Sequence, residues 1–294
     1  MVKMTAFPEP NRVSYQIITK PRNKRSPEYS AFVYNDEVRL SGRFYGKICS
    51  LDAYRAALAD FFLKETKHIV PNFLTRDSDH LPTNTLFGNY YEPLPFNLSV
   101  HRYSQVFNST EDLMSLGHFG FNPSLFLRLD NPVFSCNLNL ENCSQKPTKK
   151  YQLTSSELKM LEETSRNLFT FGEDLANSHG LQLISANFHF GLIKSPQGSN
   201  LVVTDEILTP ETSLYYDPEN YITFGQNLIE SLAVIKPSLT VPEITFKKSL
   251  KNTDLKKIKL SYSKFYNIFL GRKIQPICHG KGDTFLKNYV ESRF

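Results

Sequence analysis

The spacing of apolar residues changes several times along this chain between the period of a strand and the period of a helix. Residues 12–40 alternate apolar and polar positions, with breaks at two prolines. Such alternation is typical of half-buried strands. We therefore predict a curled antiparallel sheet made of residues 13–19, 29–34 and 37–44.

A helical period follows. Residues 51–68 carry one apolar stripe, which predicts a helix that Ser50 caps and Pro71 ends. The polar residues 77–88 predict a loop, and residues 94–106 predict another strand. Residues 109–150 contain prolines, many asparagines and no sustained period, so we expect a long irregular loop there.

Two strong signals open the second half of the chain. Thr154 and Glu157 have the spacing of a capping box, and a long amphipathic pattern runs from there to Gly180. Two further helices are predicted at 225–235 and 254–270. The latter is capped by Asn252 or Thr253 and ends at Gly271.

Between these helices, the segments 181–193 and 201–208 are rich in apolar and β-branched residues, and turn-forming residues separate them. This pattern predicts a β-hairpin. If the turn is symmetric about Gln197, His189 lies opposite Asp205, with the Cβ atoms roughly 5 Å apart. Such a pair can bind a metal, share a proton or remain a solvated polar pair.

The order of elements predicts an α+β fold of two lobes with a cleft between them. We expect an N-terminal antiparallel sheet lobe at 1–108 and a C-terminal α+β lobe, carrying the hairpin, at 109–294. The HGKGD sequence at 279–283 lacks a preceding strand and the full glycine spacing of a phosphate loop, so we predict a plain turn there.

Composition and charge limit the partners and the cellular compartment that we expect for this protein. The chain has 294 residues, a net charge of +5, and lysines and arginines that are scattered rather than clustered, so we expect no nucleic-acid partner. Its four cysteines form no CxxC motif, no signal peptide is visible, and no apolar run approaches 18 residues. We expect a soluble cytoplasmic protein that does not enter membranes.

Several motifs, in order and spacing, resemble the SAICAR synthetase family. Residues 205–216 read DEILTPETSLYY, where the family has D-E-x-x-T/S-P-D-x-S-R-x-W. Residues 30–32 (SAF), 61–72 and 95–103 are similar to further family segments. The resemblance implies the family's two-lobed α+β fold, with the N-terminal sheet as an ATP lid.

The departures from the family pattern are as informative as the matches. Glu9 and Pro10 stand where the family has the Gly and Lys of its ATP-covering strand. His101 stands in place of an arginine, and Leu214 in place of another. In the hairpin the family's D-x-K-x-E residues are replaced by Ser185, Asn187 and His189.

By resemblance, the chain is expected to be an ATP-dependent carboxylate–amine ligase with altered substrates. ATP with Mg²⁺ or Mn²⁺ would be the cofactors, and a small carboxylate and an amine the substrates. The catalytic candidates are Asp205, Glu206 and His189, and the metal-ligand candidates are Asp205 and His189. The substrate-binding candidates are Ser213, Glu211, His101, Arg102 and Asn187, and the candidates for cofactor binding are Arg12 and Lys24.

Two alternatives remain open. The loss of so many polar motif residues also fits a pseudoenzyme that keeps the fold as a binding or regulatory module with a protein partner. Such a module could fill its cleft with aromatic residues, for which the candidates are Phe188, Phe190, Tyr215 and Tyr216, although these residues also suit an ordinary hydrophobic core. A third hypothesis is a His189–Asp205 site that holds zinc, manganese or iron for different chemistry.

Overall fold

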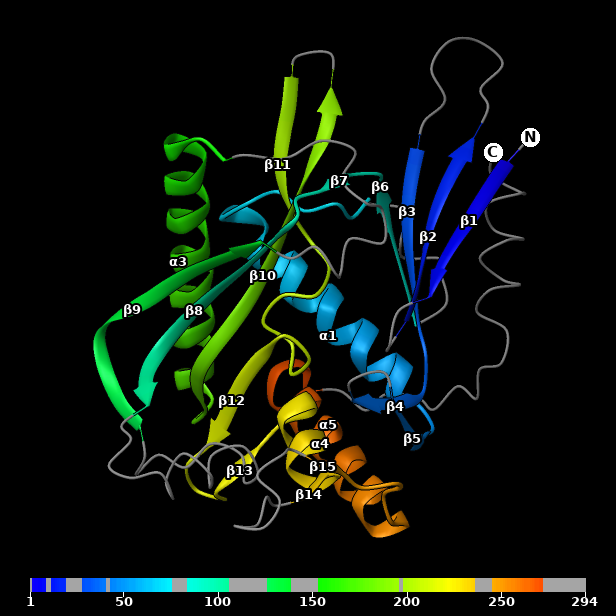
Figure 1. The fold of residues 1–294 in the computed structure, drawn as a ribbon, viewed down its shortest axis with the longest axis vertical. Coiled ribbons are helices and arrows are strands. Elements are labelled where there is room, and N and C mark those ends of the chain that lie inside the picture. The colour runs from blue at the N-terminus through cyan, green and yellow to red at the C-terminus, as the bar shows by residue number, and fades with distance from the viewer. Residues whose placement is uncertain are drawn as a thin grey trace.

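The computed structural model describes residues 2–8, 12–19, 28–40, 43–75, 84–105, 126–138, 153–195, 198–235 and 245–271. It confirms the predicted α+β class, with antiparallel sheets and few helices (Figure 1). The turn predicted at 279–283 lies outside the described residues. No helix in the described ranges is both long and apolar enough to cross a membrane.

The first sheet is antiparallel and has the strand order β1-β2-β3-β6. Its strands are β1 (Val2–Pro8), β2 (Arg12–Thr19), β3 (Glu28–Tyr34) and β6 (Thr85–Asn89). The loop predicted at 77–88 is therefore wrong at its end, where β6 pairs with β3. Gly88 permits this pairing because a Cβ there would lie 2.0 Å from the Phe73 carbonyl oxygen, a close approach that is invisible in the sequence.

The single strand predicted at 37–44 is also wrong. The structure instead has a hairpin of β4 (Glu37–Leu40) and β5 (Arg43–Lys47). Val38, Leu40 and Tyr45 are buried in a second hydrophobic cluster with residues of α4 (Gly225–Ala233) and α5 (Asn252–Leu270). Packing against these distant helices favours two short strands over one longer strand.

The larger sheet has seven strands, with a main path β13-β12-β10-β8-β9 and with β11 and β7 paired to β10. Its strands are β7 (Glu92–Pro93), β8 (Phe96–Gln105), β9 (Phe126–Leu138), β10 (Gln182–Ser195), β11 (Gly198–Thr204), β12 (Ser213–Asp217) and β13 (Ile222–Thr223). The strand predicted at 94–106 is confirmed as β8. The irregular loop predicted at 109–150 is wrong for residues 126–138, because pairing with β8 supplies β9 with backbone partners.

The central hairpin is confirmed, but its register differs by one residue. Ser195 pairs with Gly198, so His189 lies opposite Thr204 rather than Asp205. The symmetric turn assumed from the sequence was therefore wrong. Since β8 lies before residue 108 yet pairs with β10, the strands of the two predicted lobes share this sheet. The lobe boundary at residue 108 stays a prediction.

The helices begin and end close to their predicted positions. The capping box at Thr154 and Glu157 is present and opens α3 (Ser155–Ser178). Ser50 occupies the predicted N-cap position of α1 (Leu51–Glu65), but it is left-handed (φ 70°) and its side chain makes no capping hydrogen bond. The cap predicted for α5 at Asn252 or Thr253 is wrong, because both residues lie inside the helix. The N-cap is Lys251, whose backbone N–H donates to Asp254 Oδ2 at 3.1 Å.

The helix predicted at 225–235 is α4, which is two residues shorter. Residues Val234–Ile235 form the strand β14, which pairs with β15 (Thr245–Phe246). The helix expected to reach residue 68 continues past α1 as a 3-10 turn, η1 (Thr66–His68).

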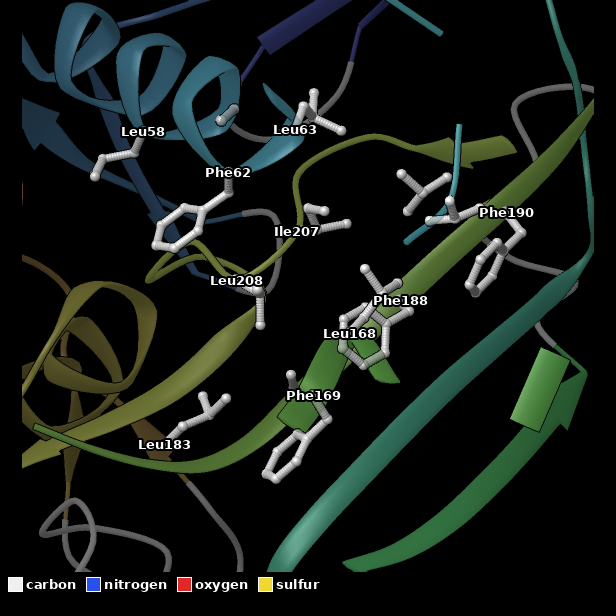
Figure 2. Packing of buried hydrophobic residues seen from close by; sticks show 14 of the residues in the cluster. Leu58, Phe62, Leu63, Leu168, Phe169, Leu183, Phe188, Phe190, Ile207 and Leu208 are labelled. Carbon is white, nitrogen blue, oxygen red and sulfur yellow. The ribbon is translucent and has the colours of Figure 1, made fainter. Parts of the chain in front are cut away.

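The main hydrophobic core joins α1, α3 and α5 to the inner face of the larger sheet. Figure 2 shows how its residues from α1, α3 and β10 pack together. Phe188 and Phe190 of β10 lie in it at 0% and 1% exposure, and Tyr215 of β12 is equally buried. Tyr216 belongs to a small separate cluster with Ile184. Because all four candidate aromatics are buried in packed clusters, they are structural and do not line an open face.

A buried carboxyl group lies where α1 begins. Asp52 is 2% exposed, its Oδ1 accepts from Ala53 N at 2.7 Å, and its Oδ2 accepts from Asn84 Nδ2 at 3.1 Å. Burial, followed by the neighbouring Asp36 carboxyl, raises the pKa of Asp52 from 3.8 to about 6. The folded protein therefore holds this proton more tightly than the unfolded chain does.

We predict that Asp52→Asn removes a pH-dependent component of stability. The wild-type group contributes its full stability below about pH 4 and loses it as the pH rises through about 6. The variant should be more stable than the wild type at pH 7.5 by up to about 3 kcal/mol, with the difference vanishing near pH 4. Urea unfolding across this range measures it, with the exposed Asp174→Asn as control. A stability difference that does not change with pH would contradict the prediction.

Candidate functional site

The predicted His189–Asp205 pair does form, although by a different route from the one expected. His189 Nδ1 lies 3.7 Å from Asp205 Oδ2, and the two side chains are 31% and 25% exposed. This separation is too long for a direct hydrogen bond, and Nδ1 has no hydrogen-bond partner in the described part of the chain. A water molecule or a cation between the two groups would give His189 Nδ1 a partner.

Backbone conformation brings Asp205 to this position. Asp205 follows the last residue of β11 and is left-handed, with φ 61°. Leu208 is also left-handed, at φ 55°, which is costly for a residue with a bulky side chain. The Tyr215 hydroxyl donates to the Leu208 carbonyl at 2.7 Å and holds this strained segment in place.

The three family-motif positions of the hairpin line one face of β10. Ser185, Asn187 and His189 alternate with the buried residues Ala186, Phe188 and Phe190, as side chains of a strand do. Asn187 pairs with Ser99 of β8, and Ser185 pairs with His101. The structure therefore brings two hairpin candidates, Asn187 and His189, onto the same outer face of the sheet as the candidate His101 of β8.

A chain of side-chain hydrogen bonds crosses this face. Ser135 Oγ of β9 lies 2.6 Å from Ser99 Oγ, and Ser99 Oγ lies 3.1 Å from His101 Nε2. Desolvation lowers the pKa of His101, which favours the neutral imidazole. Neither serine was a candidate in the sequence. Ser99 could have been found as the residue two positions before His101 on one strand, but Ser135 could not, because β9 was not predicted.

Glu206 and Glu211 occupy a buried polar network. Glu206 accepts a hydrogen bond from Thr209 Oγ1 at 2.9 Å, and Arg55 Nε of α1 donates to Glu211 Oε1 at 2.6 Å. The Tyr262 hydroxyl of α5 also donates to Glu211. Burial alone would lower the pKa of Arg55, but the carboxylates, Glu211 first, raise it overall. These contacts favour a structural role for Glu206 and Glu211.

Arg102 points to the opposite side of the sheet from His101. Its guanidinium donates to both carboxylate oxygens of Glu173 on α3, with Nε–Oε1 at 2.7 Å, and to the Asp130 carbonyl at 2.8 Å. It is 8% exposed. Because its donors are occupied by protein groups, Arg102 stabilises the packing of α3 on the sheet, and its role in binding substrate stays a prediction.

The remaining candidates lie apart from the outer face. Ser213 pairs with Ala186 and so faces the inner side of the sheet, where its buried hydroxyl has no hydrogen-bond partner among the described residues. Arg12 lies in β2, but its side chain is outside the described part, and Lys24 lies outside the described residues altogether.

Comparison with known proteins gives one consistent result. The SAICAR synthetase family model matches residues 128–230, a range that includes β9, α3, the hairpin and Asp205. A phosphoribosylaminoimidazole-succinocarboxamide synthase of Flavobacterium psychrophilum is 25% identical over 176 residues, which make up 56% of this chain and 54% of that protein. The chloroplastic enzyme of Vigna aconitifolia is 33% identical over 78 residues, 26% of this chain and 22% of that protein. The matches thus span about a fifth to a half of these relatives.

Solved structures agree in fold. SAICAR synthase from Saccharomyces cerevisiae, complexed with SAICAR, is 14% identical, with a TM-score of 0.64 over 92% of this chain and 96% of that one. A SAICAR synthetase in complex with ADP is 16% identical, with a TM-score of 0.60 over 92% of this chain and 100% of that one. The resemblance indicated by the sequence motifs is confirmed: this is a highly divergent chain with the SAICAR synthetase fold.

We predict that Arg55→Met destabilises the protein by about 3–5 kcal/mol, because it leaves the Glu211 carboxylate buried without its cation. Urea unfolding measures the loss. Lys159→Met, which removes the cation of an exposed pair with Glu163, serves as control and should cost less than about 0.5 kcal/mol. Equal losses in both variants would show that the buried ion pair has no special importance.

Proposed function

We propose that this protein is an ATP-dependent ligase that joins a carboxylate to an amine, with substrates different from those of the SAICAR synthetases it resembles. The observation that carries the proposal is the His189–Asp205 pair, held at the end of the hairpin in a segment that retains the family-like D-E-x-x-T-P sequence. The match of the family model to residues 128–230 supports it, because that range contains the whole segment.

The donor set fits a divalent ion that is shared with a nucleotide. Within the described ranges no group of three or more His, Cys, Asp or Glu residues lies close enough to hold a metal, so His189 and Asp205 would supply two ligands. Ions bound with ATP commonly take only one or two protein ligands and complete their shell with phosphates and water. An imidazole ligand suits manganese or zinc better than magnesium.

In this proposal each residue has a limited role. His189 and Asp205 would hold the ion, which when bound would neutralise phosphate charge. The left-handed backbone at Asp205 directs its carboxylate toward His189, and the Glu211–Arg55 pair holds the segment that follows. On the sheet, the neutral His101 would accept a proton through Ser99 from a group bound beside Ser135.

One observation favours the second candidate, a pseudoenzyme that binds a ligand without catalysis. Three neighbouring stretches on the outer sheet face carry no lysine or arginine. They are residues 97–101 of β8, 133–137 of β9 and 185–189 of β10. A ligase of this kind must position anionic groups, and cations are the usual means. The metal–nucleotide test below separates the two candidates.

We predict that ATP with Mn²⁺ raises the melting temperature of the protein, because a ligand at 100 times its dissociation constant stabilises by about 2.7 kcal/mol. Asp205→Asn should abolish this metal-dependent shift, whereas the exposed Asp174→Asn should retain it. No shift with either Mn²⁺ or Mg²⁺ in the wild type would make the pseudoenzyme the better account.

We further predict that His189→Glu changes the preference for the ion. A carboxylate in place of the imidazole should strengthen ATP-dependent stabilisation with Mg²⁺ relative to Mn²⁺, while His189→Ala should weaken both. The ratio of the two melting shifts is the measurement. An unchanged ratio in His189→Glu would place the ion elsewhere.

A further inference from the structure

The net positive charge of this chain is concentrated in one short segment. Residues 247–264 contain seven lysines and one aspartate, a net charge of +6, while the whole chain has a net charge of +5. All the other residues together therefore have a net charge of −1. The segment leads into α5 and makes up most of that helix, which lies with α4 at the lower end of the molecule in Figure 1.

The fold places the lysines of this segment on the outer side of α5. The opposite side of the helix is packed into the hydrophobic clusters, where Ile258, Tyr262 and Phe265 are each 0% exposed. Leu260 and five lysines are exposed instead. We term these exposed residues the lysine face, and they are Lys248, Lys251, Lys256, Lys257, Lys259 and Leu260.

The lysines of the lysine face have no acidic partner within the part of the chain that the structure describes. The other two lysines of the segment are engaged. Lys247 donates to the Leu232 carbonyl at 2.5 Å, and Lys264 donates to Asp217 Oδ2 at 2.6 Å. The lysine face is therefore a surface of uncompensated positive charge.

One apolar side chain lies among the lysines. Leu260 is 68% exposed. Lys256 and Lys257 lie one helical turn before it and Lys264 lies one turn after it, and residues three or four positions apart are neighbours on a helix surface. The complement of such a surface is a group of negative charges with one apolar side chain among them.

Charge limits what can cover the lysine face. In a symmetric dimer the same surface of a second copy would meet it, and the lysines would repel each other. Residues 272–294, which follow α5, contain five lysines and arginines and two acidic residues, so their net charge of +3 is also unfavourable. The occupant must be acidic.

An acidic protein segment fits this surface better than an anionic membrane does. A helix at a membrane surface buries its apolar face among the lipids, but the apolar face of α5 is already packed in the protein. A bilayer is also wide. The exposed Glu219, whose N–H donates to the same Asp217 carboxylate that Lys264 contacts, would meet its anionic headgroups.

A nucleic acid fits less well for a different reason. Residues 247–264 contain no arginine, which is the side chain whose planar fork pairs with a phosphate through two hydrogen bonds. Lysine ammonium groups are point charges, and carboxylates on a flexible chain can adjust to them. The length of the face is also modest, because α5 rises about 20 Å between positions 251 and 264. An extended peptide covers that length with about six residues.

We propose that the lysine face docks an acidic, extended segment of a partner protein. Carboxylates of that segment pair with the lysines, and one of its apolar side chains covers Leu260. The inference goes beyond the proposed ligase, because no residue of 247–264 belongs to the His189–Asp205 site, and either idea can fail without the other.

The test is fluorescence anisotropy of the full-length protein with a labelled, capped polyglutamate peptide that has one central leucine. We expect binding that weakens at least about fivefold when the salt concentration is raised from about 0.05 M to about 0.3 M, because salt screens exposed charges. The same peptide with glutamine in place of every glutamate should not bind.

Reversing the charge of the lysine face should remove this binding. The combined variant Lys256→Glu, Lys257→Glu and Lys259→Glu should bind the peptide at least about tenfold more weakly, because each exposed ion pair contributes up to about fivefold and the new carboxylates repel the peptide. The three positions are exposed, so thermal melting can verify that the variant folds.

The matched control reverses three exposed lysines elsewhere in the chain, Lys67→Glu, Lys159→Glu and Lys194→Glu. It has the same net charge as the first variant but keeps the lysine face, so it should lose less than about threefold in affinity, through long-range electrostatics alone.

Leu260→Ser tests the apolar contact separately from the charge. It should weaken binding of the leucine-containing peptide roughly two- to tenfold, and it should leave binding of a polyglutamate peptide without leucine unchanged. A general attraction between opposite charges would not distinguish the two peptides.

Three results would overturn the inference: no binding of the leucine-containing peptide by the wild type, equal losses in the charge-reversal variant and its control, or unchanged binding in Leu260→Ser. Phosphatidylserine vesicles and a single-stranded DNA of the same charge as the peptide complete the test. Tighter binding of either than of the peptide, lost on charge reversal of the lysine face, would assign this surface to a membrane or a nucleic acid and would also overturn the inference.

Discussion

The ion pair between Arg55 and Glu211 is the interaction on which the rest of the structure depends. Arg55 is 1% exposed and reaches from α1 to Glu211, while its Nη1 donates to the Asn35 and Glu37 carbonyls beside β4. Tyr262 adds α5 to the same carboxylate. One buried charge pair therefore joins α1, the start of β4, α5 and the strained segment that holds Asp205.

This arrangement separates two kinds of polar residue that look alike in the sequence. Glu206, Glu211 and Arg102 are buried, and their polar atoms are bonded to other protein groups. Residues of the outer sheet face, such as Asn187 and His101, remain accessible to solvent. A buried charge that is already paired has little capacity left to bind a ligand, so we propose that any small-molecule ligand is recognised at the outer face and at the His189–Asp205 pair.

The same geometry shows how a fold can be kept while its chemistry changes. The packing of α3 and of Phe188 and Phe190 lies on the inner face of the sheet, where substitutions create cavities. Residues on the outer face can be replaced without disturbing that core, because alternate residues of a strand point to opposite sides. His101, Asn187 and His189, which all depart from the family pattern, lie on that outer face.

The sequence by itself determined the helices, the existence of the hairpin and the fold class, because capping residues and apolar periodicity are local signals. The box at Thr154 and Glu157 is an example. Tertiary structure alone decided β6 and β9, which exist through pairing with distant strands, and the one-residue register that places His189 opposite Thr204. It also decided which polar candidates face solvent, because a motif does not reveal that Glu211 meets Arg55 156 residues away. Charges far apart in the chain come together only when the core packs, and that packing is a property of the whole fold.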